Sequence, residues 1–165
     1  MLLKISLLSY ILYIMNTLGL LWAWLAVGLW GMWAAFWEVM IAAATMNSIL
    51  RNPDMKGKLM TFMILFIALD ETVAIYWLIV ALQILGVDPA SMTDPHMFIS
   101  AALAVWLPWI AVGIWEWYVA KTAVENMWKN PEISSILMVL TILWMALVES
   151  AAIYWLVIAF NLLWA

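Results

Sequence analysis

The chain has 165 residues, of which 70% are hydrophobic and 10% charged, and its mean hydropathy is +1.10. No soluble domain of this length can bury so many apolar side chains in one core, so the composition excludes a soluble protein. The formal net charge of −4 and the absence of a basic patch exclude nucleic acid as a partner. The chain has no cysteine, so nothing indicates its redox compartment.

Four apolar stretches follow one another along the chain, each longer than the roughly 20 residues that a helix needs to cross a membrane. Glycine and proline are few, and no stretch alternates polar with apolar residues, which favours helices over barrel strands. We therefore predict an all-α membrane protein with four transmembrane helices, at 17–50, 57–86, 95–128 and 132–164.

Residues 1–16 precede the first predicted helix and contain Lys4 followed by an apolar run. The run is typical of the start of a secretory signal, but no clear small-residue cleavage site follows it. We treat this segment as an N-terminal hydrophobic appendage. An extension of the first helix is the alternative.

Two short polar turns separate the first helix from the second and the third from the fourth. They read Arg51-Asn52-Pro53-Asp54 and Lys129-Asn130-Pro131-Glu132, with proline where the next helix begins. The outer linker at 87–94 is acidic and contains neither Lys nor Arg. Because basic residues gather at the two turns, the positive-inside rule predicts that the turns face the cytoplasm and that both termini face out.

The second half of the chain repeats the first with a shift of 78 residues (for example 116 − 38). The aligned pairs are Glu38 with Glu116, Pro53 with Pro131, Glu71 with Glu149 and Tyr76 with Tyr154. Since each copy has two helices, both copies must insert in the same direction, as a parallel repeat. The predicted organisation is two parallel-repeat helical hairpins, at 17–86 and 95–165, joined by the linker.

Four glutamates lie inside the apolar helices: Glu38, Glu71, Glu116 and Glu149. A carboxylate at membrane depth costs a few kcal/mol or more, so it usually has a function. Glu38 precedes Arg51 by 13 residues (51 − 38), which is roughly 20 Å of helix. Glu71 follows Lys58 by the same number (71 − 58), so the two carboxyls of one hairpin are predicted to lie at one level.

Two carboxylates at one level cannot both ionise cheaply, so each pair is predicted to hold a proton, a cation or one of each. Thr72 and Ser150 directly follow a glutamate and offer the hydroxyl oxygens that sodium favours. Na+ is therefore the candidate metal at Glu38/Glu71 and at Glu116/Glu149. The structural alternatives are a hydrogen bond between protonated glutamates and hydroxyls that bond to their own helix.

Nothing in the sequence indicates covalent chemistry. There is no nucleophile constellation, phosphate loop or metal cluster, so we predict a non-catalytic chain that needs no cofactor. Asp70 has no acidic counterpart in the second copy, where Val148 stands, and the sequence gives it no role.

The run from Met145 to Leu163, MALVESAAIYWLVIAFNLL, resembles the second helix of the c subunit of F-type ATP synthases, in which an essential carboxylate precedes A-I-Y-G-L-V. The RNPD and KNPE turns resemble that family's polar loop. Glu116 stands where related subunits have the first-helix Gln or Glu that co-ligates the ion. The resemblance covers nearly the whole chain from about residue 17, twice.

This resemblance implies a rotor-ring subunit in the cell membrane that carries H+ or Na+ and catalyses nothing itself. Glu71 and Glu149 would be the carriers, with Glu38 and Glu116 as co-ligands. The implied partners are other copies of the chain in a ring, the a subunit of the stator, the central-stalk subunits gamma and epsilon, and membrane lipid. The stalk-contacting residues would be Arg51, Asn52, Pro53, Lys129, Asn130 and Pro131.

Other interpretations stay open. Tandem fusions of this kind also occur in V-type and archaeal-type ATPases, which makes their proteolipid subunit the nearest alternative. A small four-helix multidrug exporter also combines intramembrane Glu with Trp, but it needs no duplicated hairpin with stalk-binding loops. A membrane scaffold would have no use for four buried carboxylates.

The chain departs from this family in having 14 tryptophans and only 6 glycines, where the family has a glycine-rich first helix. The repeat aligns Gly28 with Trp106, Gly31 with Trp109 and Gly86 with Trp164. We hypothesise that many of these tryptophans are glycine codons read with the wrong code, since UGA means glycine in some bacteria and tryptophan in others. Interfacial anchoring is the alternative, but Trp33, Trp37, Trp115 and Trp117 lie close in sequence to the carboxylates.

Overall fold

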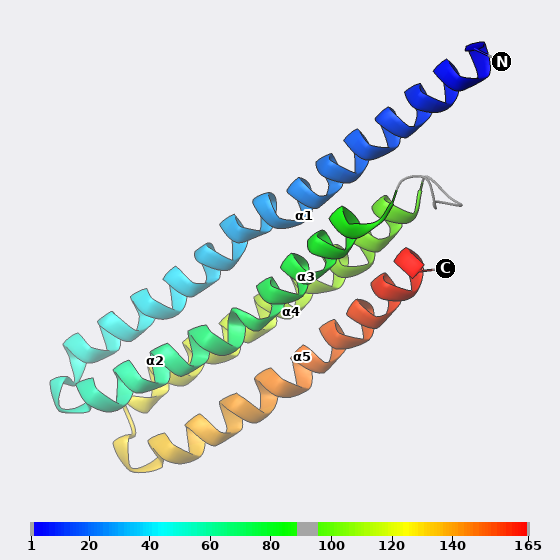
Figure 1. The fold of residues 1–165 in the computed structure, drawn as a ribbon. Helices are drawn as coiled ribbons and strands as arrows, with labels where there is room; N and C mark the ends of the chain where they lie inside the picture. Colours follow the sequence, from blue (N-terminus) through cyan, green and yellow to red (C-terminus); the bar gives the residue numbers. More distant parts are fainter. Residues whose placement is uncertain (1, 89–95, 165) are drawn as a thin grey trace.

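The computed structural model describes residues 2–88 and 96–164, and within these ranges all regular secondary structure is helical (Figure 1). The long helices are α1 (Leu2–Arg51), α2 (Lys56–Asp70), α3 (Thr72–Gly86), α4 (Met97–Met127) and α5 (Ser134–Trp164). α1 and α4 run in one direction, whereas α2, α3 and α5 run in the other.

Each predicted polar turn folds as a short 3-10 helix, at Pro53–Met55 and Pro131–Ile133. Proline suits the first position of such a turn because its missing N–H would have no partner there. The amide of Asn52 donates to the backbone carbonyl of Trp128 at 3.0 Å, which joins the end of α1 to the end of α4. Both turns therefore lie at the same end of the molecule.

Four helical segments are long and apolar enough to cross a membrane: Gly31–Arg51, Pro53–Gly86, Met97–Met127 and Pro131–Trp164. Since the two hairpins point the same way, the all-α membrane fold with four transmembrane helices in parallel repeats is confirmed. Many large apolar side chains stay exposed on the bundle, as expected of a surface that faces lipid.

The helix boundaries differ from the predicted ones in two places. α1 begins at Leu2, so residues 2–16 continue the first helix, as the alternative interpretation of this segment expected. The second predicted helix is divided at Glu71 into α2 and α3. Residues 89–95, which include most of the predicted outer linker, lie outside the described residues.

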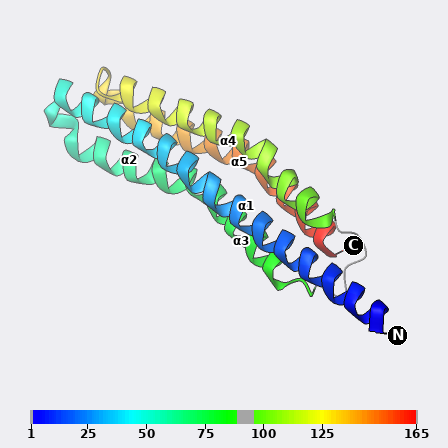
Figure 2. The same cartoon turned by 90° about the horizontal axis from the view of Figure 1, so that it is seen from above.

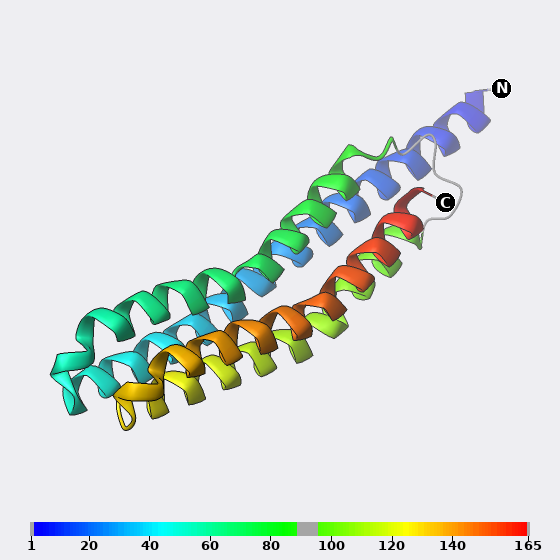
Figure 3. The same cartoon turned by 90° about the horizontal axis from the view of Figure 1, so that it is seen from below.

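The local bonding changes at the division. The N–H of Ala74 donates to the carbonyl of Glu71 three residues earlier, at 3.0 Å, where a regular α-helix bonds four residues back. The Thr72 hydroxyl donates to the carbonyl of Leu69 at 2.6 Å, but Ser150 makes the same bond inside the unbroken α5, so this bond does not by itself explain the break. The chain changes direction between α2 and α3, beside a candidate carrier (Figure 3).

The buried side chains form two clusters along the bundle, and Figure 2 shows how the helices run together over its length. One cluster surrounds Trp77 of α3 and Trp109 of α4, whose rings meet edge to face at 6.3 Å. The other lies nearer the turns and includes Ile41, Leu59 and Met127. These two clusters fix the helices that carry the acidic side chains.

Candidate ion-binding site

The first pair of glutamates joins across the first hairpin. The carboxyl of Glu38 in α1 is hydrogen-bonded to the carboxyl of Glu71, so the two lie at one level, as the residue counts predict. A hydrogen bond between two carboxyls requires a proton on one of them. Glu38 is half-buried and Glu71 is exposed. The pair can therefore hold a proton on the outer surface of the chain.

Glu149 takes its partners from the other hairpin. Its Oε1 accepts a hydrogen bond from the Tyr76 hydroxyl at 2.8 Å and is also bonded to the Thr72 hydroxyl. Both partners belong to α3, whereas Glu149 lies half-buried in α5. The sequence associates Thr72 with its neighbour Glu71, but the structure brings its hydroxyl to Glu149 instead.

The bonding of Thr72 bears on the proton of Glu149. A hydroxyl has a single proton, yet Thr72 lies within hydrogen-bond distance of both the Leu69 carbonyl and Glu149. When Thr72 donates to Leu69, the carboxyl of Glu149 must supply the proton for the contact between them. This arrangement suits a carboxyl that has taken up its ion.

Glu116 and Asp70 are almost completely buried, with 1% and 3% of their surfaces exposed. Both oxygens of Glu116 and Oδ1 of Asp70 have no hydrogen-bond partner among the described residues. Asp70 and Glu149 both lie near Glu116. Because an unpaired ionised carboxylate in such a place is very costly, these groups must be neutral or share a cation.

Ser150 and Tyr154 are the repeat counterparts of Thr72 and Tyr76, but they are placed differently. The Ser150 hydroxyl donates to the carbonyl of Leu147 in its own helix at 2.7 Å. The side chain of Tyr154 is 69% exposed. The second repeat thus presents this tyrosine on the outside of the chain, whereas the first repeat uses its tyrosine inside.

Sodium is the metal that the sequence favours at these pairs. Within the described residues, no group of three or more His, Asp or Glu side chains is arranged to hold a metal ion. Two carboxyls alone do not complete the shell of a hard cation, which takes about six or more oxygens. A sodium ion at either pair would therefore also need hydroxyl and backbone carbonyl oxygens, of the kind that Thr72 and Leu69 bring beside Glu149.

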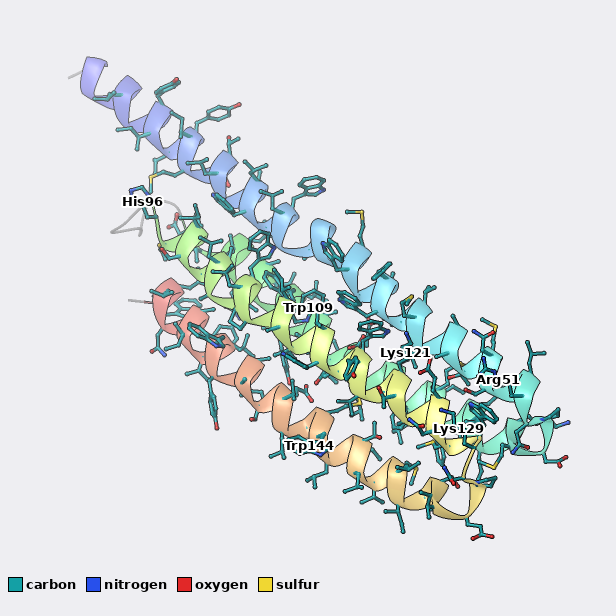
Figure 4. All side chains as sticks on the ribbon, turned by 180° about the vertical axis from the view of Figure 1, so that it is seen from behind. Arg51, His96, Trp109, Lys121, Lys129 and Trp144 are labelled. Carbon is teal, nitrogen blue, oxygen red and sulfur yellow. The ribbon has the colours of Figure 1, made fainter. Side chains whose placement is uncertain are left out.

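The predicted stalk-contacting residues lie together at the turn end. Figure 4 shows Arg51 and Lys129 at this end and His96 at the opposite one. The side chains of Pro53, Asn130 and Pro131 are exposed, and that of Asn52 is half-buried. The two turns thus form a single basic and polar surface that is open to a partner.

Two of the four tryptophans beside the carboxylates fill space between helices, whereas Trp33 and Trp115 are exposed. Trp37 of α1 meets Trp117 of α4 with ring centroids 5.2 Å apart, and it also lies against Gly113. The indole nitrogen of Trp117 is buried and has no hydrogen-bond partner among the described residues, which costs about 1–3 kcal/mol. Glycine at this position would not bear that cost.

Two residues at this site are not predicted from the sequence. In the sequence Tyr76 is only a marker of the repeat, although its recurrence as Tyr154, five residues after each glutamate, is a usable signal. Asp70 gives no signal, because the second copy has valine at the matching position. Only the packing of α2 against α4 reveals that its side chain is buried.

Comparison with known proteins identifies the repeated unit. The family of the ATP synthase C subunit matches twice, at residues 21–84 and 99–162, with the 78-residue shift of the repeat. A curated ATP synthase c subunit, from Desulfotalea psychrophila (strain LSv54 / DSM 12343), is 51% identical over 39 residues. That match covers 24% of this chain and 47% of the relative, so the chain spans about half of the relative's length.

Proposed function

Because the chain belongs to the ATP synthase C subunit family, we propose that it is an ion-carrying subunit of the rotor ring of an F-type ATP synthase. Two copies of the family's unit in one chain would give the ring two carrier sites per subunit. The chain itself makes and breaks no covalent bond. Its contribution is to take up an ion, move it through the membrane and release it.

The contact between Glu149 and α3 is the observation that carries this proposal. Thr72 and Tyr76 of the first repeat reach the carrier glutamate of the second. The matching tyrosine of the second repeat, Tyr154, is exposed, and so is the matching carrier glutamate, Glu71. The same contact, repeated between chains, would join Ser150 and Tyr154 of one copy to Glu71 of the next.

A contact of this kind uses two different surfaces of the chain. Head-to-tail contacts between identical subunits produce a closed ring when the rotation between them closes. Each subunit would then contribute one complete site of its own, at Glu149, and would complete a second site with its neighbour, at Glu71. This supports a homo-oligomeric ring.

In the proposed cycle, Glu71 and Glu149 each take an ion from one half-channel of the stator's a subunit. The bound ion neutralises the carboxylate, because a charged group facing lipid would cost several kcal/mol. Glu38 and Glu116 help to hold the ion. An arginine of the stator would favour ionisation at the release point, where the ion leaves through the other half-channel.

We favour sodium as the carried ion, with one glutamate of each pair kept protonated. Glu149 has the second carboxyl of its own hairpin, Glu116, near it and the Thr72 hydroxyl of the other hairpin beside it, which is more oxygen than a proton requires. A proton would use the same carrier glutamates without needing these additional oxygens. The ion is cargo in either case, and no resident cofactor is proposed.

The basic turns would contact the central-stalk subunits gamma and epsilon. Arg51, Asn52 and Pro53 lie beside Lys129, Asn130 and Pro131 on one surface. The positive-inside rule supports a cytoplasmic position for this surface in a multi-pass protein of the cell membrane, with both termini outside. The soluble sector of the complex would then bind on the cytoplasmic side.

Isolation of the chain in its native complex tests the function. We expect soluble ATPase subunits and a stator to co-purify with a ring of this chain, and the nature of those subunits distinguishes an F-type from a V-type or archaeal-type complex. Isolation without any such subunits, together with binding of cationic drugs, would instead indicate a multidrug exporter.

A further inference from the structure

A small polar cavity lies between α1 and α4 at the turn end, away from the candidate carrier glutamates. Its volume is about 190 Å³, and its polar lining comes from Asn47, Ser48 and Arg51 of α1 and from Glu125, Trp128 and Lys129 at the end of α4. The membrane spans of these two helices end at Arg51 and Met127. The cavity therefore opens where lipid headgroups lie.

Two cations of the cavity are held against one aromatic ring. The guanidinium of Arg51 lies 5.3 Å from the ring centre of Trp128, and the ammonium of Lys129 lies 5.8 Å from it. Such contacts fix the position of long, flexible side chains. Trp128 aligns with Leu50 in the repeat, so it is not one of the positions where the other copy has glycine.

The cavity also contains negative charge. Glu125 lines it together with the two cations, and the ends of α1 and α4 carry the partial negative charge of helix C-termini. This negative charge would repel a simple anion. A group with both a phosphate and an ammonium is complementary to the cavity, because the phosphate can bind the two cations and the ammonium can bind the negative groups. With about 30 Å³ per water in the liquid, the cavity has room for roughly six waters, enough for such a group.

We propose that this cavity binds the headgroup of an aminophospholipid, with the phosphate at Arg51 and Lys129 and the primary ammonium at Glu125. Arginine and lysine both make charge-assisted hydrogen bonds to phosphate oxygens. A primary ammonium donates hydrogen bonds to a carboxylate, which a trimethylated ammonium cannot do. The cavity should therefore prefer phosphatidylethanolamine to phosphatidylcholine, whichever ion the chain carries.

The test uses the intact complex in nanodiscs made from phosphatidylethanolamine, phosphatidylcholine and phosphatidylglycerol, and bound stalk is measured in every variant because Arg51 and Lys129 are also proposed to contact it. After a detergent wash, mass spectrometry counts the phospholipids that each chain retains. We expect the wild-type chain to retain phosphatidylethanolamine about tenfold more strongly than phosphatidylcholine. Arg51→Gln with Lys129→Gln should lose retention of every phospholipid, and Glu125→Gln should lose only the preference for the primary amine.

The matched control is Lys56→Gln, which removes a cation at the same end of the molecule but outside the cavity. This variant should retain lipid as the wild type does. If Lys56→Gln lost as much phospholipid as the cavity variant, general surface charge would explain the retention and the proposal would be overturned. Full displacement of the lipid by millimolar inorganic phosphate would overturn it too, since the site would then bind free anions, and so would equal retention of all three lipids.

Discussion

The two hairpins carry the same acidic residues, but they place them in different surroundings. In the first, Glu71 is exposed and is hydrogen-bonded to Glu38 within its own hairpin. In the second, Glu149 is half-buried and is bonded to Thr72 and Tyr76 of the first hairpin. The repeated sequence thus produces one site that is completed inside the chain and one that lies open at its surface.

This difference follows from the position of each hairpin in the chain. The first hairpin lies against Glu149 and supplies its hydrogen-bond partners, whereas the side chain of Glu71 is exposed. In a ring of two-unit chains, one contact between hairpins lies within each chain and the next lies between neighbouring chains. Its two sites should become alike only when another copy binds.

The largest effect is expected from the carriers themselves. Glu71→Gln and Glu149→Gln should each reduce ion-driven ATP synthesis in proteoliposomes to background, because every site of a rotating ring must pass the stator and an amide cannot release an ion. Asp88→Asn, at an exposed acid that follows α3 and lies in neither turn, is the control and should keep normal activity. Normal synthesis in either carrier variant would remove that glutamate from the mechanism.

The tyrosines test whether the outer site is completed by a neighbouring copy. Tyr76→Phe removes a hydrogen bond to the ion-loaded form of Glu149, and such a bond is worth about 0.5–1.5 kcal/mol, so ion affinity at Glu149 should fall by up to about tenfold. Tyr154→Phe should lower the ion affinity at Glu71 by a similar factor in the assembled ring and leave the ion affinity at Glu149 unchanged. Ion binding at each glutamate is read from protection against carbodiimide labelling, located by mass spectrometry. A Tyr154→Phe ring with normal binding at Glu71 would break the head-to-tail arrangement.

Much of this site is predictable from the sequence because helix geometry is regular. Counting from Arg51 and Lys58 places Glu38 and Glu71 at one level, and the structure joins them. The partners of Glu149 are not predictable in this way, because they depend on how one hairpin is turned against the other. Burial of Asp70 depends on the same packing, and the break at Glu71 has no counterpart at Glu149 in the second copy of the repeat.

The hydroxyls should give a smaller effect than the tyrosines. Thr72 divides its bonding between Leu69 and Glu149, so Thr72→Ala should cost the site only about 0.5–1 kcal/mol, or a two- to fivefold loss of ion affinity at Glu149. Thr72→Ser keeps the hydroxyl and should restore the affinity. An unchanged affinity in Thr72→Ala would show that this hydroxyl serves only its own helix.

The two repeats can also be compared at the positions where one copy has tryptophan and the other has glycine. If glycine is the encoded residue, the gene should carry UGA codons at positions such as Trp106, Trp109 and Trp164, whose counterparts are glycine. The natural protein should then be lighter by mass spectrometry, and its α1 and α4 should approach closer than the roughly 8 Å that is the lower limit for ordinary helix pairs. Ordinary UGG codons at these positions would end the hypothesis.

Carbodiimide labelling of the intact complex tests the central claim most directly, since a hydrophobic carbodiimide modifies protonated carboxyls in apolar surroundings. We expect labelling to concentrate on Glu71 and Glu149, and we expect added sodium to slow it at a pH where these sites are partly protonated. Labelling that follows pH but ignores sodium would identify the carried ion as H+ and leave the carriers in place. Labelling spread evenly over all acidic residues would contradict the account, because neither glutamate would then be a special site.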